Sequence, residues 1–289
     1  MKNKSKFQIG FIGAGKLGSA FAKALNSAGY EINGVASRLG YSAEKLARSS
    51  RSKAQSVEEV VQASNLIFIV TNDDAIIEVV ENSHWYAGQM VVHMSGALGL
   101  DVLNGAKSSG SDVASLHPIH TFARMDENFK DDFFGLETNS DPLRNILHEI
   151  VRDLEGQIVD VSTANRALYH ASAVMSCGYI TTLLSDALIA WRAADLPYEE
   201  GVQALLQMTT TTLKNIREKG FTGALTGPIQ RNDKTTVEKH LAAIKDHAPH
   251  LSDMYCSLGR RMAALAHQES DEDIKEWADF FLVNAERKP

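Results

Sequence analysis

Short apolar runs alternate with helical patterns through the first half of the chain. Residues 65–70 form a nearly continuous apolar run, which is typical of a strand buried on both faces of a sheet. The other runs of strand length occupy residues 7–12, 31–36, 90–94, 113–116, 133–138 and 157–161. Helical patterns occupy residues 19–28, 42–51, 57–63 and 142–154, and another ends at residue 81. Strands that alternate with helices predict an α/β fold, with a doubly wound Rossmann domain over residues 1–162.

The pattern changes at Thr163, after which no strand is predicted. Residues 164–194 are apolar or small on most faces, apart from scattered polar groups such as His170 and Asp186. A helix that is apolar nearly all round is buried in the protein or in a subunit interface. Further helical patterns occupy residues 202–219, 237–247, 253–268 and 271–286. The second domain, residues 163–289, is therefore predicted to be all-helical.

The first predicted strand leads into a glycine-rich turn. Gly13, Gly15 and Gly18 have the G-x-G-x-x-G spacing of a dinucleotide-binding turn, and they stand between a strand and a helix. Gly13 allows the tight turn, Gly15 leaves room for a pyrophosphate, and Gly18 lets the helix approach the strand closely. The residues predicted to contact the dinucleotide here are Gly13, Ala14, Gly15, Lys16, Leu17 and Gly18.

The same turn has two alternatives to dinucleotide binding. The residues from Gly10 to Lys16 also have the spacing of a phosphate-binding loop, G-x-x-x-x-G-K. That loop requires Ser or Thr at the next position to hold magnesium, and the chain has Leu17 there. The remaining alternative is a glycine turn with a purely structural role.

The end of the second predicted strand favours NADP(H) over NAD(H). An acidic residue there would bind the ribose hydroxyls of NAD, whereas this chain has Ser37 and Arg38. Arginine can clamp a 2′-phosphate, and serine can donate a further hydrogen bond. The alternative is an Arg38 that is merely solvated in a loop. Thr71 and Asn72 follow another strand, and we expect them to face the cofactor, to cap the next helix, or both.

Composition and charge exclude several other classes of protein. The chain has 289 residues, of which 44% are hydrophobic, so it can bury a large core. Its formal charge of −7 is not arranged in blocks, which makes nucleic acid an unfavourable partner. Cys177 and Cys256 are the only cysteines, which indicates a reducing compartment. We expect no membrane-spanning stretch and no signal peptide, and therefore a cytoplasmic protein.

Candidate groups for the chemistry lie outside the glycine turn. His170, on the long apolar helix, could donate a proton as a hydride arrives, and a hydrogen-bonded structural histidine is the alternative. Ser95 and His117 follow predicted strands and are expected to line the site beside the nicotinamide. His120 follows as well, but two histidines without cysteine ligands or an H-E-x-x-H pattern do not predict a metal site.

A loop in the second domain supplies the remaining candidates. It contains Arg231 and Asp233 among turn residues. Arg231 could hold the carboxylate of a substrate with two hydrogen bonds. The alternative is a helix capped by Asp233, with Arg231 paired to it on the surface.

Five segments of the chain together resemble a known family of bacterial proteins. These are GFIGAGKLG at 10–18, HMSGAL at 93–98, SLHPIHTFA at 115–123, LYHASAV at 168–174 and LTGPIQRND at 225–233. The family joins a Rossmann-like NADP-binding domain to a helical C-terminal domain long described as of unknown function. More distantly, the chain is similar to pyrroline-5-carboxylate reductase, 3-hydroxyisobutyrate dehydrogenase and ketopantoate reductase.

The resemblance implies roles for particular residues. His170 occupies the place where the dehydrogenase relatives have a catalytic lysine, and Arg231 and Asp233 are implied to be site residues. The relatives form dimers through their helical domains, so a homodimer is expected here too. The family often has Asn where this chain has Gly178, which removes an amide that could hold the substrate oxygen.

Together these features predict an NADPH-dependent oxidoreductase. Its expected substrate is a small carbonyl acid, with ketopantoate as one candidate. His170 would protonate the developing alkoxide, Ser95 and His117 would polarise the carbonyl, and Arg231 would hold the carboxylate. The alternatives are an imine reductase of the pyrroline-5-carboxylate reductase type and a protein that binds NADPH without turnover.

Overall fold

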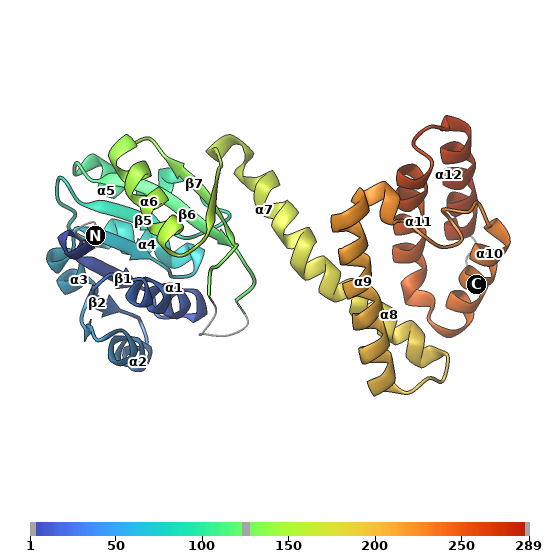
Figure 1. Cartoon of the computed structure of the whole chain (residues 1–289), viewed down its shortest axis with the longest axis horizontal. Helices are drawn as coiled ribbons and strands as arrows, with labels where there is room; N and C mark the ends of the chain where they lie inside the picture. Colours follow the sequence, from blue (N-terminus) through green and yellow to red (C-terminus); the bar gives the residue numbers. More distant parts are fainter. Residues whose placement is uncertain (1–3, 123–127, 287–289) are drawn as a thin grey trace. The chain divides into compact units, whose positions relative to one another are not determined.

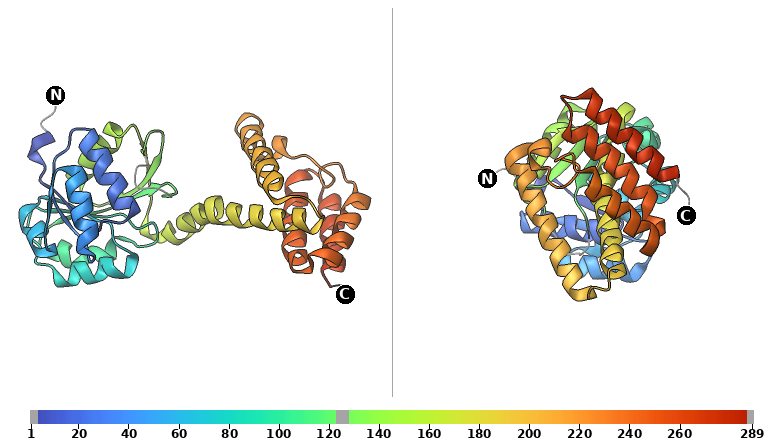
Figure 2. Two further views of the ribbon diagram at one scale, coloured as in Figure 1. Left: turned by 90° about the horizontal axis from the view of Figure 1, so that it is seen from below. Right: turned by 90° about the vertical axis from the view of Figure 1, so that its right-hand side faces the viewer.

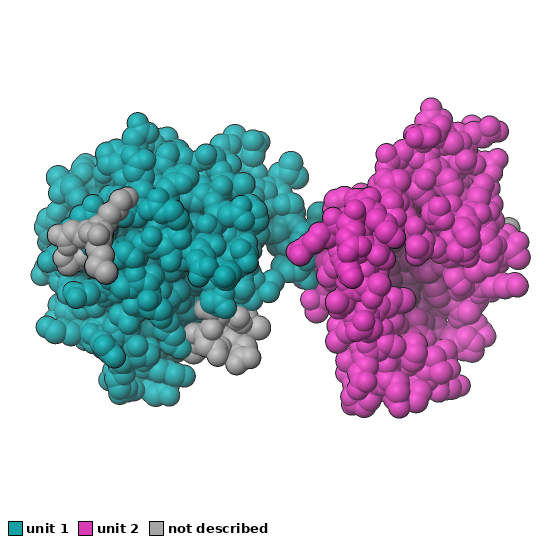
Figure 3. All heavy atoms as spheres, viewed as in Figure 1, with its two compact units in different colours: residues 1–177 teal, residues 178–289 magenta. Residues whose placement is uncertain are grey.

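The structure is a computed structural model that describes residues 4–122 and 128–286 (Figure 1). The outermost residues of both predicted domains, 1–3 and 287–289, lie outside this range, as does Ala123 of the quoted motif. The chain divides into two compact units, residues 1–177 and 178–289 (Figure 3). The change from strands to helices falls at residue 163, earlier than the division between the units. The prediction that the helical domain carries substrate binding and dimerisation stays a prediction.

An eight-stranded sheet forms the centre of the first unit, in the order β3-β2-β1-β4-β5-β6-β7-β8. Neighbouring strands are parallel except for β6 and β7, which are antiparallel. Because β2 and β4 lie on opposite sides of β1, the carboxyl end of β1 is a switch point where a ligand can enter. The strands are β1 (Ile9–Ile12), β2 (Ile32–Ala36), β3 (Lys53–Ala54), β4 (Leu66–Ile69), β5 (Met90–His93), β6 (Asp112–Ile119), β7 (Phe133–Thr138) and β8 (Gln157–Asp160).

Helices cover both faces of this sheet, as Figure 1 shows. Helices α1 (Lys16–Ser27), α2 (Gly40–Ser50) and α6 (Asp141–Asp153) contribute to the core on one face. Helices α3 (Val57–Ala63), α4 (Asp73–Asn82) and α5 (Asn104–Ser108) contribute to the core on the other. Along β1 the side chains alternate between the two cores, Phe11 into the first and Ile12 into the second. The predicted doubly wound fold is confirmed.

Strand β6 is longer than its sequence predicts. The prediction ended the strand at Leu116 and placed His117 after it, which is wrong, because His117 and Pro118 lie inside β6. Proline is a usual sign that a strand has ended, since it cannot donate a backbone hydrogen bond. Here β6 continues because β7 pairs with it, with His117 opposite Gly135 and Pro118 opposite Phe134. The short strand β3 was also absent from the prediction.

The long apolar segment is a series of helical pieces. A 3-10 turn (Thr163–Asn165) precedes α7 (Arg166–Val174), a π-helical segment (Met175–Tyr179) and α8 (Ile180–Ala193). No residue of α8 is buried in the described chain, so the expectation that this helix is buried within the protein is wrong. The other expectation, burial in a subunit interface, stays a prediction. Residues Thr163–Ala193 are also long and apolar enough to cross a membrane, contrary to expectation, although one such helix is weak evidence.

The second unit is helical throughout its described part. Besides α8 it contains α9 (Tyr198–Ala224), α10 (Lys234–His247), α11 (Ser252–Ala266) and α12 (Asp271–Glu286). Helices α11 and α12 pack side by side, which Figure 2 also shows. Their contact buries Trp277 and Phe281 completely, and Gly259 lies directly against the Phe281 ring. The remaining short 3-10 turns among the described residues are Lys4–Lys6, Leu100–Leu103 and Pro249–Leu251.

Candidate functional site

The glycine turn has the geometry that its spacing predicts. Gly13 has a φ of 117°, and a Cβ there would lie 2.5 Å from the carbonyl oxygen of Val70. A Cβ on Gly18 would lie 2.5 Å from the carbonyl oxygen of Gly13, so α1 can start this close to the turn only without a side chain. At Gly15, by contrast, a Cβ would meet no atom within 4 Å. Gly15 therefore faces open space beside the N-terminus of α1, where a phosphate can approach the backbone.

A cavity of about 600 Å³ lies at this end of β1. It brings together the ends of β1, β2 and β4, which are far apart in the sequence. Lys16, Leu17 and Gly18 form the first turn of α1 and do not line it, and neither does Ser95. The predicted cofactor residues that do line it are Gly13, Ala14, Gly15, Ser37, Arg38, Thr71 and Asn72.

Several polar groups of this cavity have no partner among the described residues. Arg38 is exposed and makes no hydrogen bond or ion pair there. The hydroxyl oxygen of Thr71 is buried and unpaired. Asn72 is the N-cap residue of α4, but its side chain makes no capping hydrogen bond. An arginine, a hydroxyl and a free helix N-terminus around one cavity suit the phosphates and ribose of a dinucleotide.

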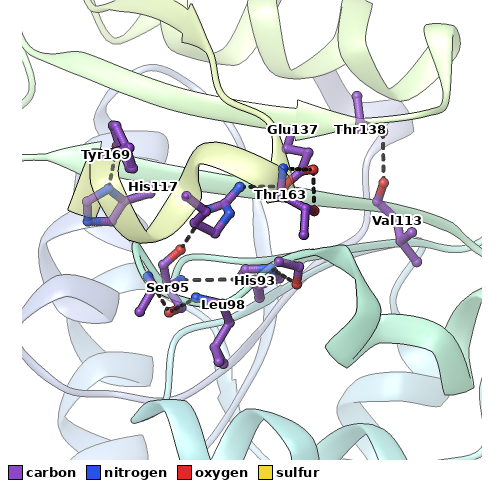
Figure 4. A network of polar contacts seen from close by, with 12 residues as sticks. His93, Ser95, Leu98, Val113, His117, Glu137, Thr138, Thr163 and Tyr169 are labelled. Carbon is purple, nitrogen blue, oxygen red and sulfur yellow. Dashed lines mark hydrogen bonds and ion pairs between the residues drawn. The ribbon is translucent and has the colours of Figure 1, made fainter. Parts of the chain in front are cut away.

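An ion pair of a buried arginine with a partly buried glutamate lies in the same unit, at the start of α7. Arg166 is 2% exposed, and its Nη2 donates to Oε2 of Glu137 at 2.7 Å. Its Nη1 donates to the carbonyl oxygen of Ser95 at 3.3 Å. Oε1 of Glu137 accepts hydrogen bonds from the backbone N–H and the hydroxyl of Thr163, at 2.6 and 2.5 Å (Figure 4). Burial alone would raise the pKa of Glu137, but these hydrogen bonds and the charge of Arg166 hold it below its ordinary value.

His93 and Ser95 form a tightly bonded turn after β5. Nε2 of His93 donates to the carbonyl oxygen of Gly99 at 3.1 Å, and Nδ1 accepts from the N–H of Ser95 at 3.2 Å. These bonds fix a neutral imidazole. Burial, together with the charge of Arg166, lowers the pKa of His93 to about 4. The hydroxyl oxygen of Ser95 accepts the N–H groups of Ala97 and Leu98, which leaves its own proton available to a ligand.

His117 is joined to Tyr169 of α7. The Tyr169 hydroxyl and Nδ1 of His117 are 2.6 Å apart. Burial raises the pKa of Tyr169 to about 12, and burial, His170 and the charge of Arg166 lower the pKa of His117 to about 4. Both groups are therefore neutral near pH 7. Since a phenol is a stronger donor than a neutral imidazole, we infer that Tyr169 donates to Nδ1 and that the His117 proton lies on Nε2.

His170 and His117 meet at Gly96. Their ring centroids are 6.0 Å apart. A Cβ on Gly96 would lie 2.6 Å from Nδ1 of His170 and 2.7 Å from Nε2 of His117, so both rings need a glycine at this position. Nδ1 of His170 is buried and has no hydrogen-bond partner in the part of the chain that the structure describes. The structure thus brings together the predicted catalytic residue His170 and the predicted substrate residues Ser95 and His117 in one cluster, which can supply imidazole and hydroxyl donors.

Arg231 and Asp233 lie in the second unit. Asp233 is the N-cap of α10, where its two carboxylate oxygens accept the N–H and the hydroxyl of Thr236 at 3.0 and 2.6 Å. These hydrogen bonds lower its pKa. Arg231 is exposed. The capping alternative therefore describes Asp233, and a role in substrate binding stays a prediction for both residues.

The sequence patterns did not indicate Arg166, Glu137, Tyr169 and His93 as site residues. One signal was available, because an arginine on an otherwise apolar helix needs a partner. The identity of that partner could not be read from the sequence, since Glu137 lies on a strand 29 positions away. His120 contacts Asp132 at 2.9 Å rather than joining His117. Among the described residues, no group of three or more His, Cys, Asp or Glu side chains could hold a metal ion.

Comparisons with known families agree with this organisation. Residues 2–118 match the Rossmann-like domain, and residues 133–262 match the domain of unknown function DUF2520. No curated protein matches the sequence. The chain therefore combines a Rossmann-like domain with a DUF2520 domain, which confirms the resemblance expected from its motifs.

Several solved structures have a similar fold over nearly the whole chain. BF3122 of Bacteroides fragilis, provisionally named an NADP oxidoreductase, is 26% identical, with 89% of this chain and 98% of that chain covered and a TM-score of 0.73. TM1727 of Thermotoga maritima is 24% identical, with 90% and 99% covered and a TM-score of 0.72. An imine reductase of Myxococcus stipitatus in complex with NADP+ is 19% identical, with 94% and 99% covered and a TM-score of 0.65. The last two comparisons show the fold alone.

The neutral histidines make a testable contribution to stability. A histidine whose pKa is near 4 in the folded protein and about 6.5 when unfolded takes up a proton on unfolding at pH values between the two. The free energy of unfolding should therefore decrease as the pH falls through this window, by about 1.4 kcal/mol per pKa unit and histidine at most. His93→Asn keeps a hydrogen-bonding side chain but does not titrate, so urea unfolding of this variant should depend less steeply on pH.

The matched control is His250→Asn, because His250 is exposed in the folded protein. This variant and the unsubstituted protein should show the same dependence of the free energy of unfolding on pH. Equal slopes for the His93 variant and the unsubstituted protein would contradict the assignment of a neutral, buried His93.

Proposed function

We propose that this chain, which joins a Rossmann-like domain to a DUF2520 domain, is an NADPH-dependent oxidoreductase that reduces a small carbonyl acid. The observation that carries the proposal is the cavity at the end of β1, where Gly15 faces open space and Arg38 and Thr71 have no partner among the described residues. The likeness to BF3122, whose name refers to NADP, supports the same cofactor. When bound, NADPH would supply the hydride.

Different residues of the cavity would bind different parts of NADPH. Gly13, Gly15 and the N-terminus of α1 would hold the pyrophosphate, because backbone N–H groups there face the anion. Ser37 and Arg38 would bind the 2′-phosphate, Arg38 with two parallel hydrogen bonds. The hydroxyl of Thr71 would bind the ribose or the phosphates, which would pair a buried oxygen that has no partner among the described residues.

The cluster around Gly96 would act on the substrate. His170 would donate a proton to the oxygen of the reduced carbonyl, directly or through water. His117, with its proton on Nε2, and the hydroxyl of Ser95 would donate hydrogen bonds to the same oxygen as negative charge develops. Arg231 is the candidate for holding the carboxylate. Ketopantoate is a candidate substrate, because it has both a ketone and a carboxylate.

The direct test is oxidation of NADPH by the purified protein against a panel of 2-oxo acids, including ketopantoate, and of cyclic imines. Turnover of a 2-oxo acid supports the proposal and names the substrate class. Tight binding of NADPH with no turnover of any compound would contradict it and favour a non-catalytic NADPH-binding protein, an outcome that Gly178 makes worth testing.

An imine reductase is the second candidate, favoured by the fold that the chain shares with the imine reductase of Myxococcus stipitatus. A protonated imine needs no strong acid, and the neutral His117 would not repel it. His170→Ala separates the two candidates. Turnover should fall by about 10²–10⁴-fold if His170 is the general acid for a carbonyl, and only a few-fold for an imine.

Arg38 should determine the choice between the two nicotinamide cofactors. Arg38→Ala removes the clamp on the 2′-phosphate and should weaken NADPH binding by about 10- to 100-fold, with little effect on NADH. Fluorescence titration with both cofactors measures this. Arg48→Ala is the matched control, because Arg48 is an exposed arginine of α2 that pairs with Glu44. Equal losses for NADPH and NADH would contradict the assignment.

We also propose a cytoplasmic homodimer that forms through the apolar helices. Leu168, Met175 and Tyr179 are 77%, 56% and 63% exposed in the single chain, and a second copy would cover them. Light scattering at micromolar concentration should give twice the chain mass. Leu168→Glu with Tyr179→Glu should shift the protein toward the monomer, because charges would be buried. A monomer of the unsubstituted protein would contradict the dimer.

A further inference from the structure

Arg166 is unusual among the buried residues that the structure describes. It is the only Arg, Lys, Asp or Glu among them. Taking a guanidinium out of water is unfavourable unless the group is paired and hydrogen-bonded. An apolar side chain would fill the same space without that cost. We therefore expect the arginine to be needed for the geometry that its hydrogen bonds impose.

The bonds of Arg166 tie the start of α7 to two strands of the sheet. Through Glu137 it is bonded to β7, and through the carbonyl of Ser95 it is bonded to the turn that follows β5. Thr163, in the turn before α7, is bonded to the other oxygen of Glu137. Glu137 therefore holds both the 3-10 turn and the first residue of the helix. The planar fork of a guanidinium fixes direction as well as distance, which an apolar contact does not.

The functional side chains of α7 follow from this anchor. Tyr169 and His170 are three and four residues after Arg166, so they project from the same side of the helix. Tyr169 must reach His117 across Gly135, where a Cβ would lie 2.5 Å from the Tyr169 hydroxyl oxygen. His170 must fit against Gly96 with as little clearance. A small rotation or shift of α7 would break both contacts.

We propose that Arg166 and Glu137 are positioning residues that set the rotation and the height of α7 over the sheet. They hold His170 and the Tyr169–His117 pair at the Ser95–Gly96 turn. Neither residue touches the reacting atoms in this assignment. The expected effect on activity rests on the proposed function. The expected effect on the position of the histidines rests only on the described contacts.

The test compares two arginines that make similar bonds. Arg166→Lys keeps the positive charge but cannot bridge Glu137 and the Ser95 carbonyl with one fork. Arg144→Lys is the matched control, because Arg144 of α6 pairs with Asp160 and donates to the carbonyl of Thr138, and neither bond involves Tyr169 or a histidine. Glu137→Gln is the second variant, which keeps the shape of the side chain if Arg166→Lys does not fold.

The kinetic arm measures kcat, KM and the dissociation constant of NADPH on whichever substrate the panel identifies. We expect kcat of Arg166→Lys to fall by about 100-fold, the effect of a misplacement near 1 Å. The dissociation constant of NADPH should stay within about two-fold, because the glycine turn is not part of this network. Glu137→Gln should lower kcat in the same way, and the double variant should lose less than the product of the two single losses.

The second arm is nitrogen NMR of protein labelled at histidine, and it does not depend on activity. Arg166→Lys should change the ring signals of His117 and His170, with the hydrogen bond from Tyr169 to His117 weakened, whereas Arg144→Lys should not. Unchanged histidine signals and an unchanged kcat in Arg166→Lys would overturn the inference. Changed histidine signals in a protein that turns over no substrate would support the positioning and contradict only the proposed reaction.

Discussion

The central strands of the first unit are buried on both faces, and this constraint places nearly every candidate residue. Side chains of β1 and β4 enter two separate cores, so neither strand can slip by one residue without exposing apolar groups. With the register set, the carboxyl ends of β1, β2 and β4 meet at one edge of the sheet. The glycine turn, Arg38 and Thr71 therefore line one cavity although long stretches of chain separate them.

A second constraint acts where the chain leaves the sheet for its helices. Strand β7 runs antiparallel to β6, and this places Glu137 where it can pair with Arg166 at the start of α7. The same pairing extends β6 to include His117, opposite Gly135. The sheet and α7 thus build the histidine cluster together, and the ion pair of Arg166 with Glu137 joins them. Lowered histidine pKa values and a fixed tautomer of His93 follow from this burial.

Parts of the candidate site could be predicted where neighbouring residues in the sequence form a recognisable pattern. The glycine spacing predicts the turn because only glycine accepts the φ of 117° at Gly13 and the close approach at Gly18. His170 could be singled out because an imidazole on an apolar helix needs an explanation. Its neighbours could not be chosen, since nothing in the sequence indicates that Tyr169 and Gly96 both lie against the ring of His117. Asp233 could be read equally as a cap or as a substrate ligand, and its bonds to Thr236 are those of a cap.

The sequence by itself determined which segments are strands and helices, the doubly wound class, and the glycine turn, because periodicity and backbone sterics act over a few neighbouring residues. Tertiary structure decided the length of β6, the partner of Arg166 and the exposure of α8. Pairing with β7 extends β6 past its proline. The charge of Arg166 is buried because an opposite charge on another element pairs with it. An apolar helix such as α8 is covered only where another surface packs against it. Each of these depends on contacts between residues that lie far apart along the chain.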